Sequence, residues 1–113
     1  MTIDELLKDK TKKAKEKTET VSQWLVEGSI LTDELIVFAE KSKDAQKATC
    51  IESFEYATKK HPEIANENLL SFATAMLAEK APRVKWESAK VIGNIAPYFP
   101  EKLQIVIEKL LEN

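Results

Sequence analysis

The sequence contains a 38-residue repeat, and this period constrains the fold more than any other feature. Pro62 and Pro100 stand 38 positions apart, and each follows two amphipathic helical patterns. The other positions in register are Phe38/Met76, Ile51/Ala89, Phe54/Ile92, Ala57/Ile95 and Glu63/Glu101. Most of these shared positions are apolar, as expected of a packed core. Because helical pairs that recur at such a period stack on one another, the sequence predicts a helical repeat protein.

Composition agrees with a single all-α domain over residues 1–113. The chain is 43% hydrophobic and 32% charged, with two glycines and four prolines, which is typical of a mostly helical protein. Its longest apolar run, Leu35–Ala39, is far shorter than the roughly 20 residues that cross a bilayer. The acidic start of the chain lacks a signal-peptide pattern, and one cysteine forms no internal disulfide. We therefore expect no membrane contact and a cytoplasmic location.

The patterns divide the chain into an N-terminal capping helix (1–28), two helical repeats (29–65 and 66–102) and a terminal half-repeat helix (103–113). Thr2 and Glu5 have the spacing of a capping box, and Gly28 stands where the first helical pattern ends. We expect one helix between them and about five helices in all.

Polar caps and prolines set the expected helix ends within the two repeats. Helices are predicted to begin at Thr32, at Asp44 and near Asn66, and the second of them to stop before Pro62. In the fourth repeat helix Gly93 lies beside the apolar positions, so we expect it to permit close approach of a neighbouring helix.

The segment from Val84 to Ala96, followed by Pro100, resembles the second helix of a HEAT repeat. Val84, Lys85, Ala89, Ile92, Gly93 and Ile95 occupy the characteristic positions. One period earlier the same places hold Gln46, Lys47, Ile51, Phe54, Glu55 and Ala57, without the opening valine and the glycine. The resemblance covers residues 29–113 and implies an alpha-alpha superhelix.

HEAT-like proteins are mostly non-catalytic protein-binding scaffolds or adaptors, so the resemblance implies that function here. Some HEAT-like proteins instead excise damaged bases from DNA, and others handle bilin chromophores, but this chain does not match their site residues. We expect protein partners or self-association, the latter through Leu6 and Leu7 or through Val106 and Leu110.

Large aromatic and cationic side chains are the candidate contact residues. They are Trp86, Trp24, Arg83, Lys85 and Tyr98. A tryptophan on an exposed ridge is a natural anchor for a partner, whereas the alternative is packing between repeats.

A lysine-rich stretch supports an alternative function, binding of nucleic acid. Its members are Lys8, Lys10, Lys12, Lys13, Lys15 and Lys17, to which Lys85 and Arg83 would have to be added. The net charge of −2 provides no general attraction for phosphates, so these cations would have to converge on one face. The simpler interpretation is a solvated helix with mixed charges.

The sequence predicts no catalytic, cofactor-binding or metal-binding residues, no small-molecule substrate and no enzyme activity. Cys50 and His61 are the only residues of their kinds and lie three helical turns apart, about 16 Å along an axis. One of each cannot complete a zinc site. The acid pairs Glu52/Glu55 and Glu63/Glu67 have the spacing of ordinary exposed helix faces. We expect Cys50 to be a small buried apolar side chain.

Overall fold

The computed structural model is an all-α fold, and it describes residues 1–102, 105, 107, 108 and 111. Within this part of the chain there are six α-helices and no strands. The helices are α1 (Ile3–Lys8), α2 (Ala14–Glu27), α3 (Thr32–Glu40), α4 (Asp44–Lys60), α5 (Glu67–Met76) and α6 (Pro82–Ile95). The predicted contacts at Val106 and Leu110 lie outside the described residues, as does most of the expected terminal half-repeat.

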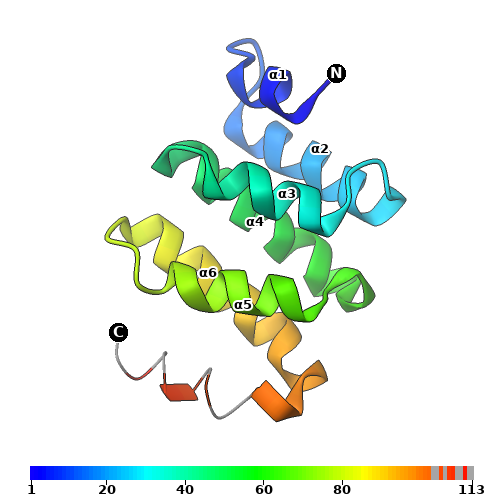
Figure 1. Cartoon of the computed structure of the whole chain (residues 1–113). Coiled ribbons are helices and arrows are strands. Elements are labelled where there is room, and N and C mark those ends of the chain that lie inside the picture. The colour runs from blue at the N-terminus through cyan, green and yellow to red at the C-terminus, as the bar shows by residue number, and fades with distance from the viewer. Residues whose placement is uncertain (103–104, 106, 109–110, 112–113) are drawn as a thin grey trace.

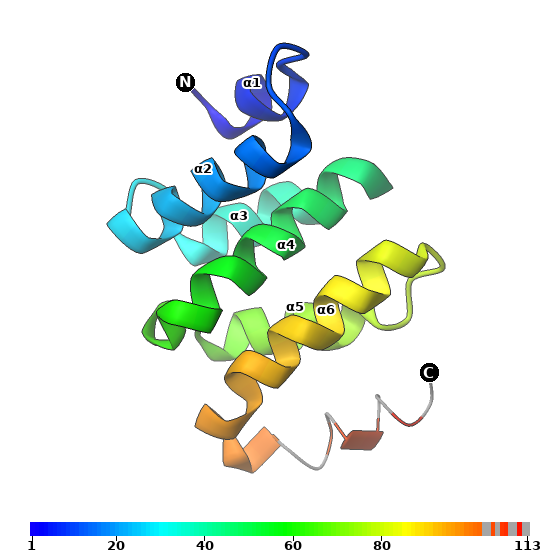
Figure 2. The ribbon, with the colours of Figure 1, turned by 180° about the vertical axis from the view of Figure 1, so that it is seen from behind.

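The helices form two layers (Figures 1 and 2). One layer contains α2, α4 and α6, with α4 packed between the other two, and the second contains α3 and α5. Each helix of the second layer also packs against its successor, α3 on α4 and α5 on α6. The arrangement is compatible with a helical repeat, in which each helical pair covers the next.

The 38-residue period corresponds to equivalent structural positions. Pro62 and Pro100 each begin a 3₁₀ turn, Pro62–Ile64 and Pro100–Lys102. Phe54 and Ile92 are both buried in the same hydrophobic cluster, at 0% and 2% exposure. A proline at the first position of a turn loses no hydrogen bond and brings a suitable φ angle. The sequence therefore located both the turns and the core positions of the repeat.

The expected single N-terminal helix is wrong, because the chain turns between α1 and α2. Asp9 accepts hydrogen bonds from the backbone N–H and the hydroxyl of Thr11, at 2.8 and 2.6 Å. This local turn competes with the helix. It also avoids a continuous helix whose closely spaced lysines would repel one another. Lys13 precedes α2 and provides no side-chain cap, so the sequence lacked the usual signal for a second start.

The turn folds α1 back so that its leucines enter the core. Leu6 is 1% exposed and Leu7 is 7% exposed, and the Lys17 ammonium donates to the Leu7 carbonyl at 2.9 Å. The expectation that these leucines are an exposed self-association surface is therefore wrong.

Other predicted helix ends are confirmed. Thr2 and Glu5 form the capping box, and Asn66 caps α5 by accepting from the Leu69 N–H at 2.8 Å. Gly28 takes the left-handed conformation, with φ of 81°, that a helix C-terminus commonly requires. No helix in the described ranges is long and apolar enough to cross a membrane.

Candidate functional site

The layer formed by α2, α4 and α6 contains a groove of about 660 Å³. Its lining is rich in charged side chains from all three helices, among them Glu19, Glu52, Lys59, Glu87 and Lys90. The lining contains four acids (Glu19, Glu52, Glu55 and Glu87) and three lysines (Lys59, Lys60 and Lys90), so the groove has no strong field of one sign.

Trp86 lies on an exposed ridge of α6 formed by Arg83, Trp86 and Lys90, and Lys90 also lines this groove. Arg83, Trp86 and Lys90 are three and four residues apart and therefore share one side of the helix. The side chain of Trp86 is 69% exposed, although its neighbours Val84 and Glu87 are buried. The hypothesis that Trp86 packs between repeats is wrong, and a large aromatic surface remains available to a partner.

The two cations of this ridge are already paired with acids of the same chain. The Arg83 guanidinium lies 3.5 Å from the Glu52 carboxylate of α4, and the Lys90 ammonium lies 2.9 Å from that of Glu87. These contacts neutralise much of the positive charge on either side of Trp86.

Glu52 and Glu87 form a carboxyl pair across the seam between α4 and α6. Burial raises the pKa of Glu87, which is 5% exposed, and its hydrogen bond with Glu52 raises that pKa further. Burial also raises the pKa of Glu52, but hydrogen bonds from Glu87 and Thr18 and the charge of Arg83 outweigh it, so this pKa lies below its usual range. The Thr18 hydroxyl of α2 donates to Glu52 at 2.8 Å. Of the two carboxyl groups, Glu87 therefore has the raised pKa and Glu52 the lowered one.

The sequence pattern did not predict this pair, because along one helix Glu52 is matched with Glu55. Side chains of adjacent helices meet at separations close to the repeat period: Asn94 of α6, for example, hydrogen-bonds the carbonyl of Glu55 and the hydroxyl of Thr58, 39 and 36 positions earlier. Scanning polar pairs at separations near 38 would have found Glu52 with Glu87.

The remaining candidate residues do not converge on Trp86. Trp24 is partly buried and packs on the core from α2, and Lys85 is also partly buried. Tyr98 is 62% exposed in the 3₁₀ turn Ala96–Tyr98 beyond the end of α6, while Phe99 packs against the core. The structure therefore brings together only Arg83 and Trp86 of the predicted set, and adds Lys90.

The lysine-rich stretch is divided by the turn and does not form one helical stripe. Lys8 pairs with Asp4 at 3.2 Å, and Lys17 is bound to the Leu7 carbonyl. The remaining lysines lie partly in the turn and partly in α2.

Cys50 is buried at 0% exposure, which confirms its predicted place in the core. Burial raises the pKa of its thiol to about 12, so the thiolate is scarce at neutral pH. His61 lies at the far end of the continuous helix α4 and contacts the Glu63 carboxylate at 3.0 Å.

The close-approach prediction for Gly93 is wrong. Gly93 is exposed, and a Cβ atom added there would meet no atom within 4 Å. Its position on α6, seven residues from Trp86, leaves a bare stretch of backbone on the same exposed side of the helix.

The fold and this surface define an all-helical protein with stacked helical pairs and an exposed aromatic ridge. Comparisons with protein-family models, curated proteins and solved structures found no match. The HEAT resemblance thus rests on the motif residues of the chain and on the packing of its helices.

Proposed function

We propose that this protein is a non-catalytic protein-binding scaffold built on HEAT-like repeats, and that Trp86 is its principal contact residue. The observation that supports this proposal is the 69% exposure of Trp86 on a helix whose opposite face is buried in the core. Exposed tryptophans at the centre of a contact surface are frequent hot spots of binding energy. We also propose a cytoplasmic location, since the fold relies on packing and a single thiol.

The charges around Trp86 favour a protein partner over nucleic acid. Phosphate binding depends on cations that are free to replace counterions. Arg83 and Lys90 are instead paired with Glu52 and Glu87, and the turn separates the lysines of the N-terminal stretch. An aromatic ridge with locally balanced charge matches a partner surface of mixed polarity.

The test compares wild-type protein with Trp86→Ala in quantitative capture of partners from a native extract. We expect the substitution to remove at least one partner that the wild type captures, with a loss of about tenfold or more for a hot-spot tryptophan. Leu31→Ala is the matched control, because Leu31 is 61% exposed and lies outside the α6 ridge.

A titration with single- and double-stranded oligonucleotides at two salt concentrations separates the two classes of partner. Tight, steeply salt-dependent binding that Trp86→Ala reduces would replace the protein-binding proposal with nucleic-acid binding. Identical capture by wild type and Trp86→Ala would show that the ridge is not the contact surface.

A further inference from the structure

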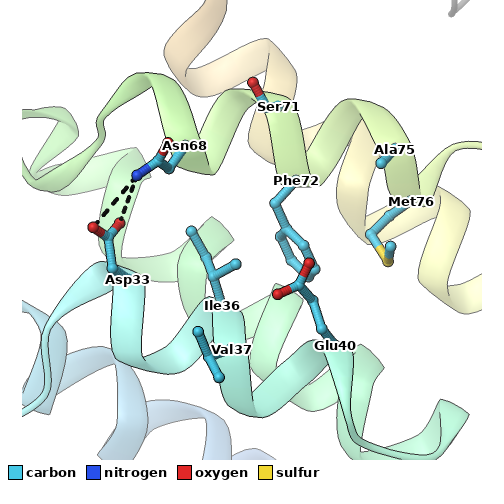
Figure 3. Close-up of a pocket in the computed structure, with 9 residues that line it drawn as sticks. All are labelled: Asp33, Ile36, Val37, Glu40, Asn68, Ser71, Phe72, Ala75 and Met76. Atoms are coloured by element: carbon cyan, nitrogen blue, oxygen red, sulfur yellow. Dashed lines mark hydrogen bonds between the residues drawn. The ribbon is translucent and has the colours of Figure 1, made fainter.

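A second groove, of about 390 Å³, lies between α3 and α5 on the layer opposite Trp86 (Figure 3). Asp33, Ile36, Val37 and Glu40 recur along α3 at helical spacing, so they form one side of the groove. Asn68, Phe72 and Met76 of α5 line the other side at the same spacing. The groove therefore runs between two helix faces, and α3 and α5 pack together less extensively than α4 and α6 do in the other layer.

The middle of the groove is apolar. Ile36 and Phe72 point toward one another from the two helices and form its floor, with 8% and 6% exposure (Figure 3). Val37 is 50% exposed beside them. A partner side chain placed here would remove apolar surface from water, which favours binding.

Two carboxylates bracket this apolar centre. Asp33 and Glu40 are seven residues apart on α3, or about 10 Å along the helix axis. Asp33 accepts hydrogen bonds from the amides of Asn66 at 3.1 Å and Asn68 at 3.4 Å, and these neutral donors leave its charge in place. Among the described residues, none that lines the groove is basic, and neither acid takes part in an ion pair. The groove thus combines an apolar floor with a local charge that has no internal counterpart.

From this charge pattern we propose that the α3–α5 groove binds a basic segment of a partner protein, in which an apolar side chain lies between two lysine or arginine residues. The apolar side chain contacts Ile36, Val37 and Phe72, and the two cations face Asp33 and Glu40. In a polyproline II segment, which has three residues per turn, residues three positions apart lie on the same face and about 9 Å apart, close to the separation of the acids. This inference goes beyond the proposed function, because it concerns a different face and does not involve Trp86.

The contrast with the groove on the other layer supports this choice of occupant. There, Glu52 and Glu87 are matched by Arg83 and Lys90 within the chain. In the α3–α5 groove the cations are missing from the described lining, so complementary charge has to come from the binding segment.

The experiment is a titration of the full-length, ¹⁵N-labelled protein followed by NMR. The probe is a 12-residue peptide with the core Lys-Leu-Leu-Lys, and the control peptide has the core Glu-Leu-Leu-Glu. We expect the lysine peptide to shift backbone signals within α3 and α5 and to bind with a Kd in the range of 10⁻⁴ to 10⁻³ M. The glutamate peptide should cause no such shifts at the same concentration.

Three variants make the test specific. Glu40→Gln should weaken binding two- to fivefold, the range of one exposed ion pair, and Val37→Ser should weaken it by a similar factor. Both positions are exposed, and an unchanged thermal transition will verify that each variant folds. Trp86→Ala should leave binding of the lysine peptide unchanged, which separates this inference from the proposed function.

Several results would overturn the inference. They are equal binding of the two peptides, shifts confined to α6, and unchanged affinity in both groove variants. Concentration-dependent shifts of α3 and α5 without peptide would identify a second copy of the chain as the occupant and would also overturn it. A Trp86→Ala variant that loses extract partners but binds the lysine peptide normally would support both proposals independently.

Discussion

The helical pair α3–α4 meets the pair α5–α6 in two places. One is the seam between α4 and α6, and the other is the groove between α3 and α5. Only the seam is closed by cross-helix contacts along its length. Across the seam, Asn94 binds the backbone of α4, and Glu52 meets Glu87. Across the groove, Asp33 accepts hydrogen bonds from Asn68 of α5 and from Asn66, the N-cap of α5, all at one end, and exposed Val37 lies beside the apolar floor. Most of the packing between the two helical pairs therefore lies in one layer, and the groove in the other layer stays open.

The largest expected effect is that of Phe54→Ala. Phe54 is 0% exposed and packs edge-to-face on Phe72, with ring centroids 6.5 Å apart. Its removal leaves a cavity where α4 meets the second layer, so we expect a loss of about 3–5 kcal/mol in unfolding free energy. Chemical denaturation will measure it. Val37→Ala, on the open groove, should change stability by less than about 0.5 kcal/mol. Similar losses for both would remove the contrast between the two sides.

The next effect concerns hydrogen bonds across the seam. Asn94→Ala removes donors to the Glu55 carbonyl and the Thr58 hydroxyl, at 3.1 and 3.2 Å, and should cost about 1–2 kcal/mol. Asn68→Ala is the matched control, since its bonds to Asp33 are exposed and long. We expect the control to cost less than about 0.5 kcal/mol by thermal or chemical unfolding. An equal cost at both positions would mean that hydrogen bonds hold α3 and α5 together as firmly as they hold α4 and α6.

Glu87→Gln should stabilise the protein at neutral pH by about 1 kcal/mol, the scale of one hydrogen bond. Because burial raises the folded-state pKa of Glu87, its protonated form favours folding, and stability falls as pH rises from the unfolded-state pKa through the folded-state pKa. Glutamine imitates the protonated form and can still donate to Glu52. Thermal unfolding across pH 3–8 should show the gain above the folded-state pKa and its disappearance below the unfolded-state pKa.

Glu52→Gln is the control for the carboxyl pair and should act in the opposite direction. The pKa of Glu52 is lowered, so its charge stabilises the fold above the unfolded-state pKa and this contribution is lost as pH falls. The variant should therefore be less stable than wild type at neutral pH. Equal pH profiles for the two variants would exclude opposite pKa shifts at Glu87 and Glu52.

The smallest expected effect is a gain from Gly93→Ala on the exposed side of α6. A helix-interior glycine costs roughly 0.5–1 kcal/mol relative to alanine, and the new methyl group would contact nothing. Thermal unfolding should show this gain, whereas Gly28→Ala should lose stability because φ is 81° at that position. Destabilisation by Gly93→Ala would instead indicate that a neighbouring helix approaches Gly93 closely.

The sequence predicted the helices of the two repeats well because their signals are local and strong. Asn66 has a side chain suited to a helix start, and Pro62 stands just beyond a helix end, and the structure uses both in that way. The N-terminal break was missed because a lysine precedes α2 and the decisive contact, between Asp9 and Thr11, lies within a stretch of helix-forming residues.

The candidate site was predicted only in part. Trp86 could be named from its size, but its exposure depends on which side of α6 faces α4 and α5. The Glu52–Glu87 pair was missed because it joins residues on different helices.

By itself, the sequence determined an all-helical chain with a 38-residue period and a core at Phe54 and Ile92, because periodicity, caps and prolines act through neighbouring residues. Only the tertiary structure decided that Leu6 and Leu7 are buried, that Trp86 is exposed, and that one side of the stack closes while the other stays open. These outcomes depend on the angle and separation at which whole helices pack. Helix packing depends on side chains that are far apart in the sequence, so no local sequence pattern predicts it.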